Sequence, residues 1–378
     1  MKLCIVLNAL LPYHYARLMA LSKLISDVLV IEVSDRSAIY CGGWQNTVKG
    51  LNKEILFPDE ILETLSPKAV KEATQKALDR YRPDYVVTAG YHDTAAQSAA
   101  KWAKANRSKT VLMMDSCKGD KKRWWIKEKA KAWMIRRWYN KAFVGGWQHY
   151  LYALSLGFHP RYIWRGLTVV DNDYFKANAA KYSTNVDELR RQYKLPCRYF
   201  LCVARHSPEK NLKRLLRAYK LYKEQNKKWG LVLVGDGPQR NELEREAQNQ
   251  QLDSVVFTGW VQYEELPIYY AMASALILPS ISEPWGLVVN EAMASGLPIL
   301  ISDKCGALPE LCWRGINGYD FDPNNVNEIV KALMDISSDD ERCAFMGKAS
   351  EEIIAFFTPE RWAKILMACI ENSDNCDY

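Results

Sequence analysis

The stretch SEPWGLVVNEAMASGLPILIS, residues 282–302, gives the strongest indication of the fold. The apolar run SALILPS, residues 274–280, contains no charged residue and lies shortly before this stretch, and it predicts a buried strand. A helix is expected from about Gly286 to Ser295, Gly296 suits the left-handed position that ends a helix, and LPILIS begins the next strand. This order of strand, helix and strand predicts a parallel βαβ unit.

The same alternation occupies most of the chain. KLCIVLN, DVLVIEV, DYVVTAG and KTVLMMD predict buried strands in the first half, and YFLCVAR, GLVLVGD and SVVFTG continue the series after about residue 195. The expected fold class is therefore α/β, with two doubly wound Rossmann-like domains. We expect these domains over residues 1–170 and 180–357, with VVDNDYFKANAAKYSTN as a linker. A C-terminal helix at about 358–378 would cross back to the first domain.

Composition narrows the class of protein. The chain has 378 residues, of which 48% are hydrophobic, so it can bury two cores, and it contains no run of 18 apolar residues that would predict a membrane span. Its start reads as a buried strand rather than a signal peptide. Its ten cysteines form no CxxC pair, which favours reduced thiols in a cytoplasmic protein and no structural zinc.

Charged residues follow the strands where a ligand is expected. In open parallel sheets, ligands bind outside the carboxyl ends of the strands. Glu283 precedes the helix start and Glu291 lies about one turn into the helix. The two carboxylates could therefore accept hydrogen bonds from hydroxyl groups on either side of a phosphate. The backbone amides of Gly286, Leu287 and Val288 would supply the phosphate site. The alternative is a charge at the helix start and a solvated helix glutamate.

Two further loops carry candidate binding residues. Arg205 and Lys210, in ARHSPEKN, could neutralise a diphosphate leaving group, or they are two solvated charges in a turn. The GDGP turn, which begins at Gly235, predicts a tight connection between strand and helix, and turn geometry alone is the favoured explanation over a binding role.

Taken in order, ARHSPEKN, LVGDGP, FTGWV and LPSISEPWGLVVNEAMASGLPIL resemble the retaining glycosyltransferases of family 4, over roughly residues 195–335. The resemblance implies the GT-B fold, in which two Rossmann-like domains face a central cleft. It implies that Glu283 contacts the transferred sugar and Glu291 the nucleotide ribose. It also implies a metal-independent reaction that retains configuration and uses no cofactor. The residues that follow FTG, Trp260 and Val261, would seat the base.

The first half departs from that family. NALLPYHY and MMDSCKGD stand where many members carry a Gly-rich loop and a His, so Asp115 occupies the place of the expected His. His14, His92 and Asp115 all follow predicted strands and are candidates for the acceptor side, although an ordinary polar loop residue is the favoured interpretation for each, as it is for His149. VDND, residues 170–173, imitates an Asp-x-Asp metal motif, but its place in the expected linker favours turn chemistry.

The net charge of +7 is concentrated in one segment. Residues 101–145 contain 14 Lys or Arg against 3 Asp or Glu, which makes this segment +11 and the rest of the chain −4. Within it, residues 121–143 interleave tryptophans with Lys and Arg, which suits an anionic membrane surface. On a helical wheel Trp124, Lys131, Ile135, Trp138 and Ala142 share one side. The segment can alternatively be an amphipathic helix packed on its own sheet, or a nucleic-acid patch.

The sequence thus predicts a retaining hexosyltransferase that uses a nucleotide-diphosphate-sugar. Glu283, Arg205 and Lys210 would carry the chemistry, and Glu291, Gly286, Leu287, Val288, Gly235, Trp260 and Val261 would bind the donor. The sequence leaves the acceptor open among a lipid-linked oligosaccharide, a glycolipid and a soluble small molecule. The expected location is the cytoplasm or the inner face of a membrane, with an anionic membrane surface as partner of residues 121–143, and no nucleic-acid partner is expected. An epimerase or phosphorylase of the same architecture, and a non-catalytic membrane scaffold that binds sugar nucleotides, are the alternatives.

Overall fold

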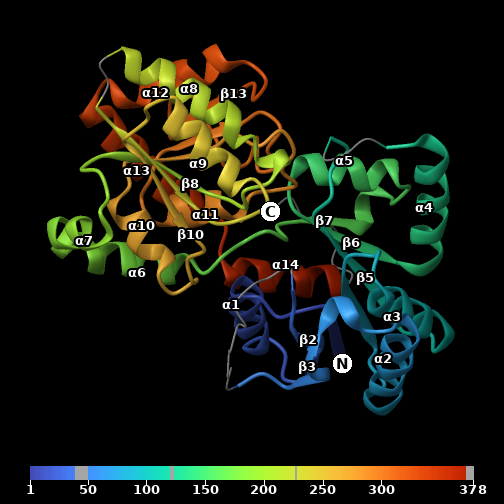
Figure 1. Ribbon diagram of the computed structural model, residues 1–378. Coiled ribbons are helices and arrows are strands. Elements are labelled where there is room, and N and C mark those ends of the chain that lie inside the picture. Colours follow the sequence, from blue (N-terminus) through green and yellow to red (C-terminus); the bar gives the residue numbers. More distant parts are fainter. Residues whose placement is uncertain (39–49, 120–122, 226–227, 372–378) are drawn as a thin grey trace. The chain divides into compact units, whose positions relative to one another are not determined.

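The computed structural model describes residues 1–38, 50–119, 123–225 and 228–371. The chain divides into two compact units (Figure 1). The first unit comprises residues 1–118, 122–170 and 359–378, and the second comprises residues 119–121 and 171–358.

The first unit alternates strands with helices along nearly its whole length. Its strands are β1 (Leu3–Leu7), β2 (Val28–Arg36), β3 (Lys53–Ile61), β4 (Tyr85–Ala89), β5 (Lys109–Met114), β6 (Lys141–Val144) and β7 (Ile163–Arg165). Its helices are α1 (Pro12–Ser22), α2 (Pro67–Tyr81), α3 (Thr94–Ala105), α4 (Trp125–Trp138), α5 (Trp147–Ser155) and α14 (Pro359–Glu371), with 3₁₀ turns at Leu62–Thr64 and Pro160–Tyr162.

The seven strands of the first unit form one parallel sheet in the order β3-β2-β1-β4-β5-β6-β7. Strand β1 pairs with β2 on one side, Leu3 opposite Val28, and with β4 on the other, Leu3 opposite Tyr85. The direction of winding therefore reverses between β1 and β4. Loops that leave the carboxyl ends of these two strands flank the point at which such sheets bind ligands.

Helix α14 completes the first unit although it follows the whole second unit in the sequence. Its Trp362 is buried and packs against Phe143 of β6, with ring centroids 5.8 Å apart. The ammonium of Lys141 is buried and donates hydrogen bonds to the carbonyl oxygens of Cys369 and Ile370 at the end of α14. These contacts attach the helix to strand β6 through both apolar packing and hydrogen bonds.

The second unit has the same alternation. Its strands are β8 (Tyr199–Val203), β9 (Gly230–Val234), β10 (Val255–Gly259), β11 (Ala275–Leu278), β12 (Ile299–Ser302) and β13 (Gly318–Phe321). Its helices are α6 (Asn172–Tyr182), α7 (Val186–Tyr193), α8 (Leu212–Glu224), α9 (Arg240–Asn249), α10 (Leu266–Met272), α11 (Leu287–Ala294), α12 (Val326–Ser337) and α13 (Asp340–Ile354), with 3₁₀ turns at Ser183–Asn185 and Pro208–Lys210.

The six strands of the second unit are also parallel, in the order β10-β9-β8-β11-β12-β13. Strand β8 lies between β9 and β11, Phe200 opposite both Leu231 and Ala275, so the winding reverses between β8 and β11. The core on one face of the sheet is formed by α8 and α12, whose buried side chains pack with Phe200 and Leu233. The predicted α/β class with two doubly wound sheets is confirmed.

Two predicted segments differ from the structure. The expected linker begins as helix α6, because Asp171 caps its first turn by accepting a hydrogen bond from the backbone of Tyr174, 3.0 Å away, and Phe175 is fully buried against Tyr270. The basic segment 121–143 is helix α4 followed by strand β6, so Ala142 lies in the sheet and cannot share a helix face with Ile135. Residues 120–122 lie outside the described part of the chain.

Candidate functional site

Helix α11 begins where the sequence predicted an anion site. Gly286 caps it with φ +92°, and a Cβ at this position would come within 2.8 Å of the Leu278 side chain, so the tight entry from β11 requires glycine. No side chain in the described part of the chain caps this helix start. The amides of Leu287 and Val288 therefore lie at a positive helix end that suits a phosphate.

Glu283 and Lys210, which were predicted separately, meet in the structure. The ammonium of Lys210 donates to Oε2 of Glu283 at 2.5 Å, and the hydroxyl of Ser280 donates to the same oxygen at 3.2 Å. The Glu283 side chain is only 10% exposed, and its backbone carbonyl accepts a hydrogen bond from Gly306 at 2.8 Å. Glu283 is thus a buried and positioned carboxylate rather than a solvated charge.

Glu291 is also buried, on the inner side of α11. Its Oε2 accepts a hydrogen bond from the hydroxyl of Tyr270 at 2.7 Å. Burial raises the pKa of Glu291 to about 7, and the hydrogen bond from Tyr270 opposes this effect. The interpretation of Glu291 as a solvated helix residue is therefore wrong.

Tyrosines surround Glu291, and sequence reasoning missed them. Tyr263 stacks on Tyr174 of α6, with ring centroids 5.3 Å apart and nearly parallel planes. Burial is the main cause that raises the pKa of Tyr263 and of Tyr270, and the negative charge of Glu291 is the second cause. Both phenols therefore stay neutral. The available signal for Tyr270 was PIYYAM, whose two tyrosines are both buried in a short helix, whereas Tyr263 lies before that helix.

The loops after β8, β9 and β10 are in direct contact. The backbone amide of Gly235 donates to the carbonyl of Gly259 at 2.9 Å, and that of His206 donates to the carbonyl of Asp236 at 2.9 Å. Gly235 has φ +130°, and a Cβ there would overlap the carbonyl oxygen of Ala204. The GDGP turn is thus a close approach between two loops as well as a turn.

The remaining predicted donor residues lie on this same edge of the second sheet. Arg205 is exposed in the loop after β8, and Trp260, which follows Gly259, is 45% exposed. Val261 is half-buried. Arg205 and Trp260 therefore have free surface available for a ligand.

His206, beside Arg205, was not predicted as a special residue. Its side chain is fully buried near Phe257, and neither ring nitrogen has a hydrogen-bond partner among the residues that the structure describes. Burial lowers the pKa of His206, so the ring stays neutral under the loop that carries Arg205.

In the first unit, His14 points inward. Its Nδ1 accepts a hydrogen bond from the backbone amide of Leu11 at 3.2 Å, at the start of α1. It lines a cavity of about 10 Å³ together with Arg17 and Trp362. Burial, followed by the charge of Arg17, lowers the pKa of His14 to about 3. His149 makes the same contact at the start of α5, its Nδ1 accepting from Gly146 at 3.1 Å.

His92 and Asp115 remain accessible. Both are exposed and follow the neighbouring parallel strands β4 and β5, so they lie on the same edge of the first sheet. The ring of His92 contacts Tyr91, with centroids 4.0 Å apart. Burial lowers the pKa of Arg17 to about 10, and the negative charge of Asp115 opposes this effect.

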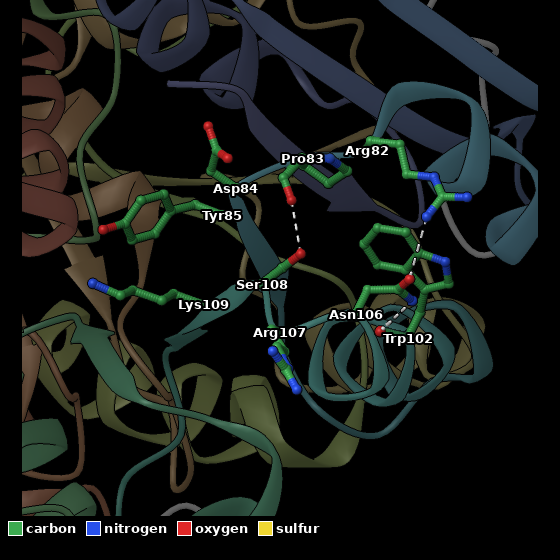
Figure 2. A pocket seen from close by; sticks show the side chains of 9 residues that line it. All are labelled: Arg82, Pro83, Asp84, Tyr85, Trp102, Asn106, Arg107, Ser108 and Lys109. Carbon is green, nitrogen blue, oxygen red and sulfur yellow. Dashed lines mark hydrogen bonds between the residues drawn. The ribbon is translucent and has the colours of Figure 1, made fainter.

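A separate hollow of about 460 Å³ lies at the opposite edge of the first sheet (Figure 2). Arg82, Tyr85 and Lys109 line it at the amino ends of β4 and β5. In Figure 2 the hydroxyl of Ser108 points to the carbonyl of Pro83, to which it donates at 2.7 Å. Because the predicted residues follow the carboxyl ends of the strands, this hollow is distinct from the candidate site.

The fold of the chain is similar to that of a solved structure. The structure of Anabaena Alr3699/HepE in complex with UDP and glucose superposes with a TM-score of 0.78 at 18% identity, over 98% of this chain and 99% of that one. Similarity at this level of identity concerns the fold, and it assigns the chain to the GT-B class.

A family model matches most of the second unit. Residues 185–353 match the model described as glycosyl transferases group 1, so this segment is similar to that family. The predicted resemblance is thereby confirmed.

Two relatives of known activity share part of the chain. A GDP-mannose-dependent alpha-(1-6)-phosphatidylinositol monomannoside mannosyltransferase of Mycobacterium tuberculosis is 31% identical over 192 residues, which is 48% of this chain and 49% of that protein. The alpha-monoglucosyldiacylglycerol synthase of Streptococcus pneumoniae is 41% identical over 120 residues, 29% of this chain and 27% of that protein. The chain thus spans half or less of the length of these relatives.

Proposed function

We propose that the protein transfers a hexose from a nucleotide-diphosphate-sugar to an acceptor hydroxyl, with retention of the anomeric configuration. The observation that carries this proposal is the pair of buried carboxylates on either side of the start of α11, one ion-paired with Lys210 and the other hydrogen-bonded to Tyr270. The similarity of residues 185–353 to the glycosyl transferase family supports it.

The donor would bind across the winding reversal between β8 and β11. The amides of Gly286, Leu287 and Val288 would hold a phosphate at the helix end, and Glu291 would accept hydrogen bonds from the ribose hydroxyls. Trp260 and Val261 would lie beside the base. Glu283 would accept hydrogen bonds from the sugar, held in place by Ser280 and Lys210.

Departure of the nucleotide diphosphate would be assisted by cations of the protein. Arg205 and Lys210 lie on one loop after β8, and together they would stabilise the negative charge that develops on the leaving phosphate. Glu283 would orient the sugar while the acceptor hydroxyl attacks on the same face from which the diphosphate leaves. A donor phosphate oxygen would accept the acceptor proton. This scheme requires neither a metal ion nor a cofactor.

The acceptor would be a lipid or lipid-linked glycan that meets the edge carrying His92 and Asp115. Two relatives whose names include phosphatidylinositol and diacylglycerol support this class of acceptor. Within the described part of the chain, no helix is both long and apolar enough to cross a membrane. With a lipid acceptor, the protein would act from the cytoplasm as a peripheral protein on the inner face of a membrane.

Transfer assays with purified protein test the proposal. UDP- and GDP-linked hexoses would be incubated with diacylglycerol, monoglycosyl lipids and phosphatidylinositol, and products identified by mass. Glu283→Gln should chiefly lower turnover, Glu291→Gln should weaken donor binding, and Glu224→Gln, an exposed change at the far end of α8, should alter neither. If Glu283→Gln and Glu291→Gln left turnover and donor affinity intact, the assigned site would be wrong.

A further inference from the structure

Helix α4 has an inner face that attaches it to the first unit. Ile135 is fully buried, and Glu128 and Lys131 form an ion pair one turn before it. The hydroxyl of Tyr152, on α5, donates to Glu128 at 2.7 Å and accepts from Lys131 at 2.8 Å. These contacts fix the rotation of α4 about its own axis, and thereby determine which residues lie on its outer face.

The outer face of α4 is unusually apolar for an exposed surface. Trp125 is 68% exposed, Ile126 61% and Trp133 62%, and Trp124, directly before the helix, is 73% exposed. At 3.6 residues per turn, Trp125, Ile126 and Trp133 occupy one continuous arc. Scattered apolar residues on a surface are ordinary, but a group of large ones on one helix marks an interaction surface.

Cations are interleaved with these apolar side chains. Lys127, Lys129, Arg136 and Arg137 are exposed on the same helix. Two of them cover the indoles, since the ammonium of Lys129 lies 4.9 Å from the Trp125 ring and the guanidinium of Arg137 lies 5.7 Å from the Trp133 ring. The only carboxylate on α4 is Glu128, which is turned to the inner face, so the outer face carries positive charge alone.

We propose that this outer face, formed by Trp124, Trp125, Ile126, Lys129, Trp133, Arg136 and Arg137, docks on an anionic lipid bilayer. Tryptophan rings enter the boundary between headgroups and acyl chains, and Lys and Arg bind the anionic headgroups. The helix lies in the plane of the interface, because its inner face is attached to the protein. The proposal rests on the peripheral location in the proposed function and names the surface responsible.

The alternative of a helix packed on its own sheet describes only the inner face, where Ile135 and Trp138 pack inward. It does not account for Trp125 and Trp133, which lie outside that stripe and are exposed. Single-stranded nucleic acid also binds aromatic and basic residues together. The bilayer is favoured because the apolar side chains project from a continuous helical arc together with an isoleucine, which offers no flat ring for a base.

Vesicle binding by the full chain tests the proposal. Wild-type protein should sediment with vesicles of phosphatidylcholine mixed with phosphatidylserine, and added salt should weaken the binding. The variant Lys129→Gln/Arg137→Gln should bind these vesicles about thirtyfold more weakly. The variant Trp124→Ser/Trp125→Ser/Trp133→Ser should lose the quenching of tryptophan fluorescence by lipids brominated on their acyl chains. Trp313→Ser, which removes a 50% exposed tryptophan of the second unit, is the matched control and should behave as wild type.

Three outcomes would overturn the proposal. The first is failure of the wild type to bind anionic vesicles. The second is binding of both α4 variants to these vesicles as tightly as the wild type. The third is binding of the α4 face to a single-stranded oligonucleotide but not to vesicles. Thermal unfolding of each variant verifies that it is folded. Thermal stabilisation by nucleotide-sugars, measured without lipid, should be the same in all variants, so that failure of membrane docking is distinguished from failure of the donor site.

Discussion

Protonation of Glu291 should control donor affinity near neutral pH. The carboxylate can accept hydrogen bonds from two ribose hydroxyls only when it is ionised, and burial raises its pKa to about 7 in the ligand-free protein. With that value, about nine-tenths of the molecules are ionised at pH 8 and about one-tenth at pH 6. The dissociation constant of the donor should therefore rise about tenfold between pH 8 and pH 6.

Isothermal titration calorimetry measures this effect directly. The ligand should be an intact nucleotide-sugar, since the terminal phosphate of a free nucleotide diphosphate titrates in the same range. At pH 6, binding to wild type should release close to one proton, visible as a dependence of the heat on the ionisation enthalpy of the buffer. Glu291→Gln should bind more weakly and show little pH dependence. A dissociation constant for wild type that is equal at pH 6 and pH 8 would refute the reasoning.

Stability of the ligand-free protein should change in the opposite direction. The folded-state pKa of Glu291 lies above its ordinary value of 4.5, so its contribution to stability is fully present below that value and is lost as pH rises through about 7. The difference corresponds to about 3 kcal/mol. Glu291→Gln should therefore raise the unfolding temperature of the second unit at pH 8 while it weakens donor binding, a combination that a merely misfolded variant would not give.

Three further substitutions follow from the geometry. Lys210→Met leaves Glu283 buried without its cation and should lower the free energy of unfolding by about 3 kcal/mol in chemical denaturation; an unchanged midpoint would show that the pair is dispensable. Tyr270→Phe removes a hydrogen bond to the ionised form of Glu291 and should move the midpoint of the affinity–pH profile upward by about one pH unit. Gly235→Ala should abolish donor-induced thermal stabilisation and cost at least about 2 kcal/mol, because its methyl group overlaps a backbone carbonyl; full donor stabilisation would contradict this.

The buried strands could be predicted because each is a short apolar run with a clear end. YFLCVAR, GLVLVGD and SVVFTG correspond to β8, β9 and β10, and helix α11 begins within one residue of its expected start. Strand β3 could not be predicted in this way. It lies at the edge of its sheet, has exposed charged residues and contains Pro58, so it lacks the pattern of a buried strand.

The helix in the expected linker and the inner face of the basic segment have a common cause. Both are polar in sequence, but a few buried side chains decide their structure. Phe175 packs α6 against α10, and Ile135 packs α4 against the first sheet. A polar composition predicts exposure on average, whereas one fully buried residue is enough to fix a helix.

The sequence did not show which residues of the candidate site contact one another, because the partners lie far apart in the chain. The order of strands and motifs identified Glu283, Lys210 and Glu291, but not that Lys210 pairs with Glu283 or that Tyr270 donates to Glu291. These pairs are separated by 73 and 21 residues, and only the strand order brings them together. The inward orientation of His14 likewise depends on the packing of α1 against α14.

The return of α14 to the first unit has a consequence for biosynthesis. On the ribosome, residues 171–358 emerge before the helix that β6 needs to bury Phe143 and to satisfy the ammonium of Lys141. The second unit can therefore reach its native state while the first unit still lacks helix α14. Nascent chains arrested before residue 359 should protect β8 and β11 from proteolysis sooner than β6.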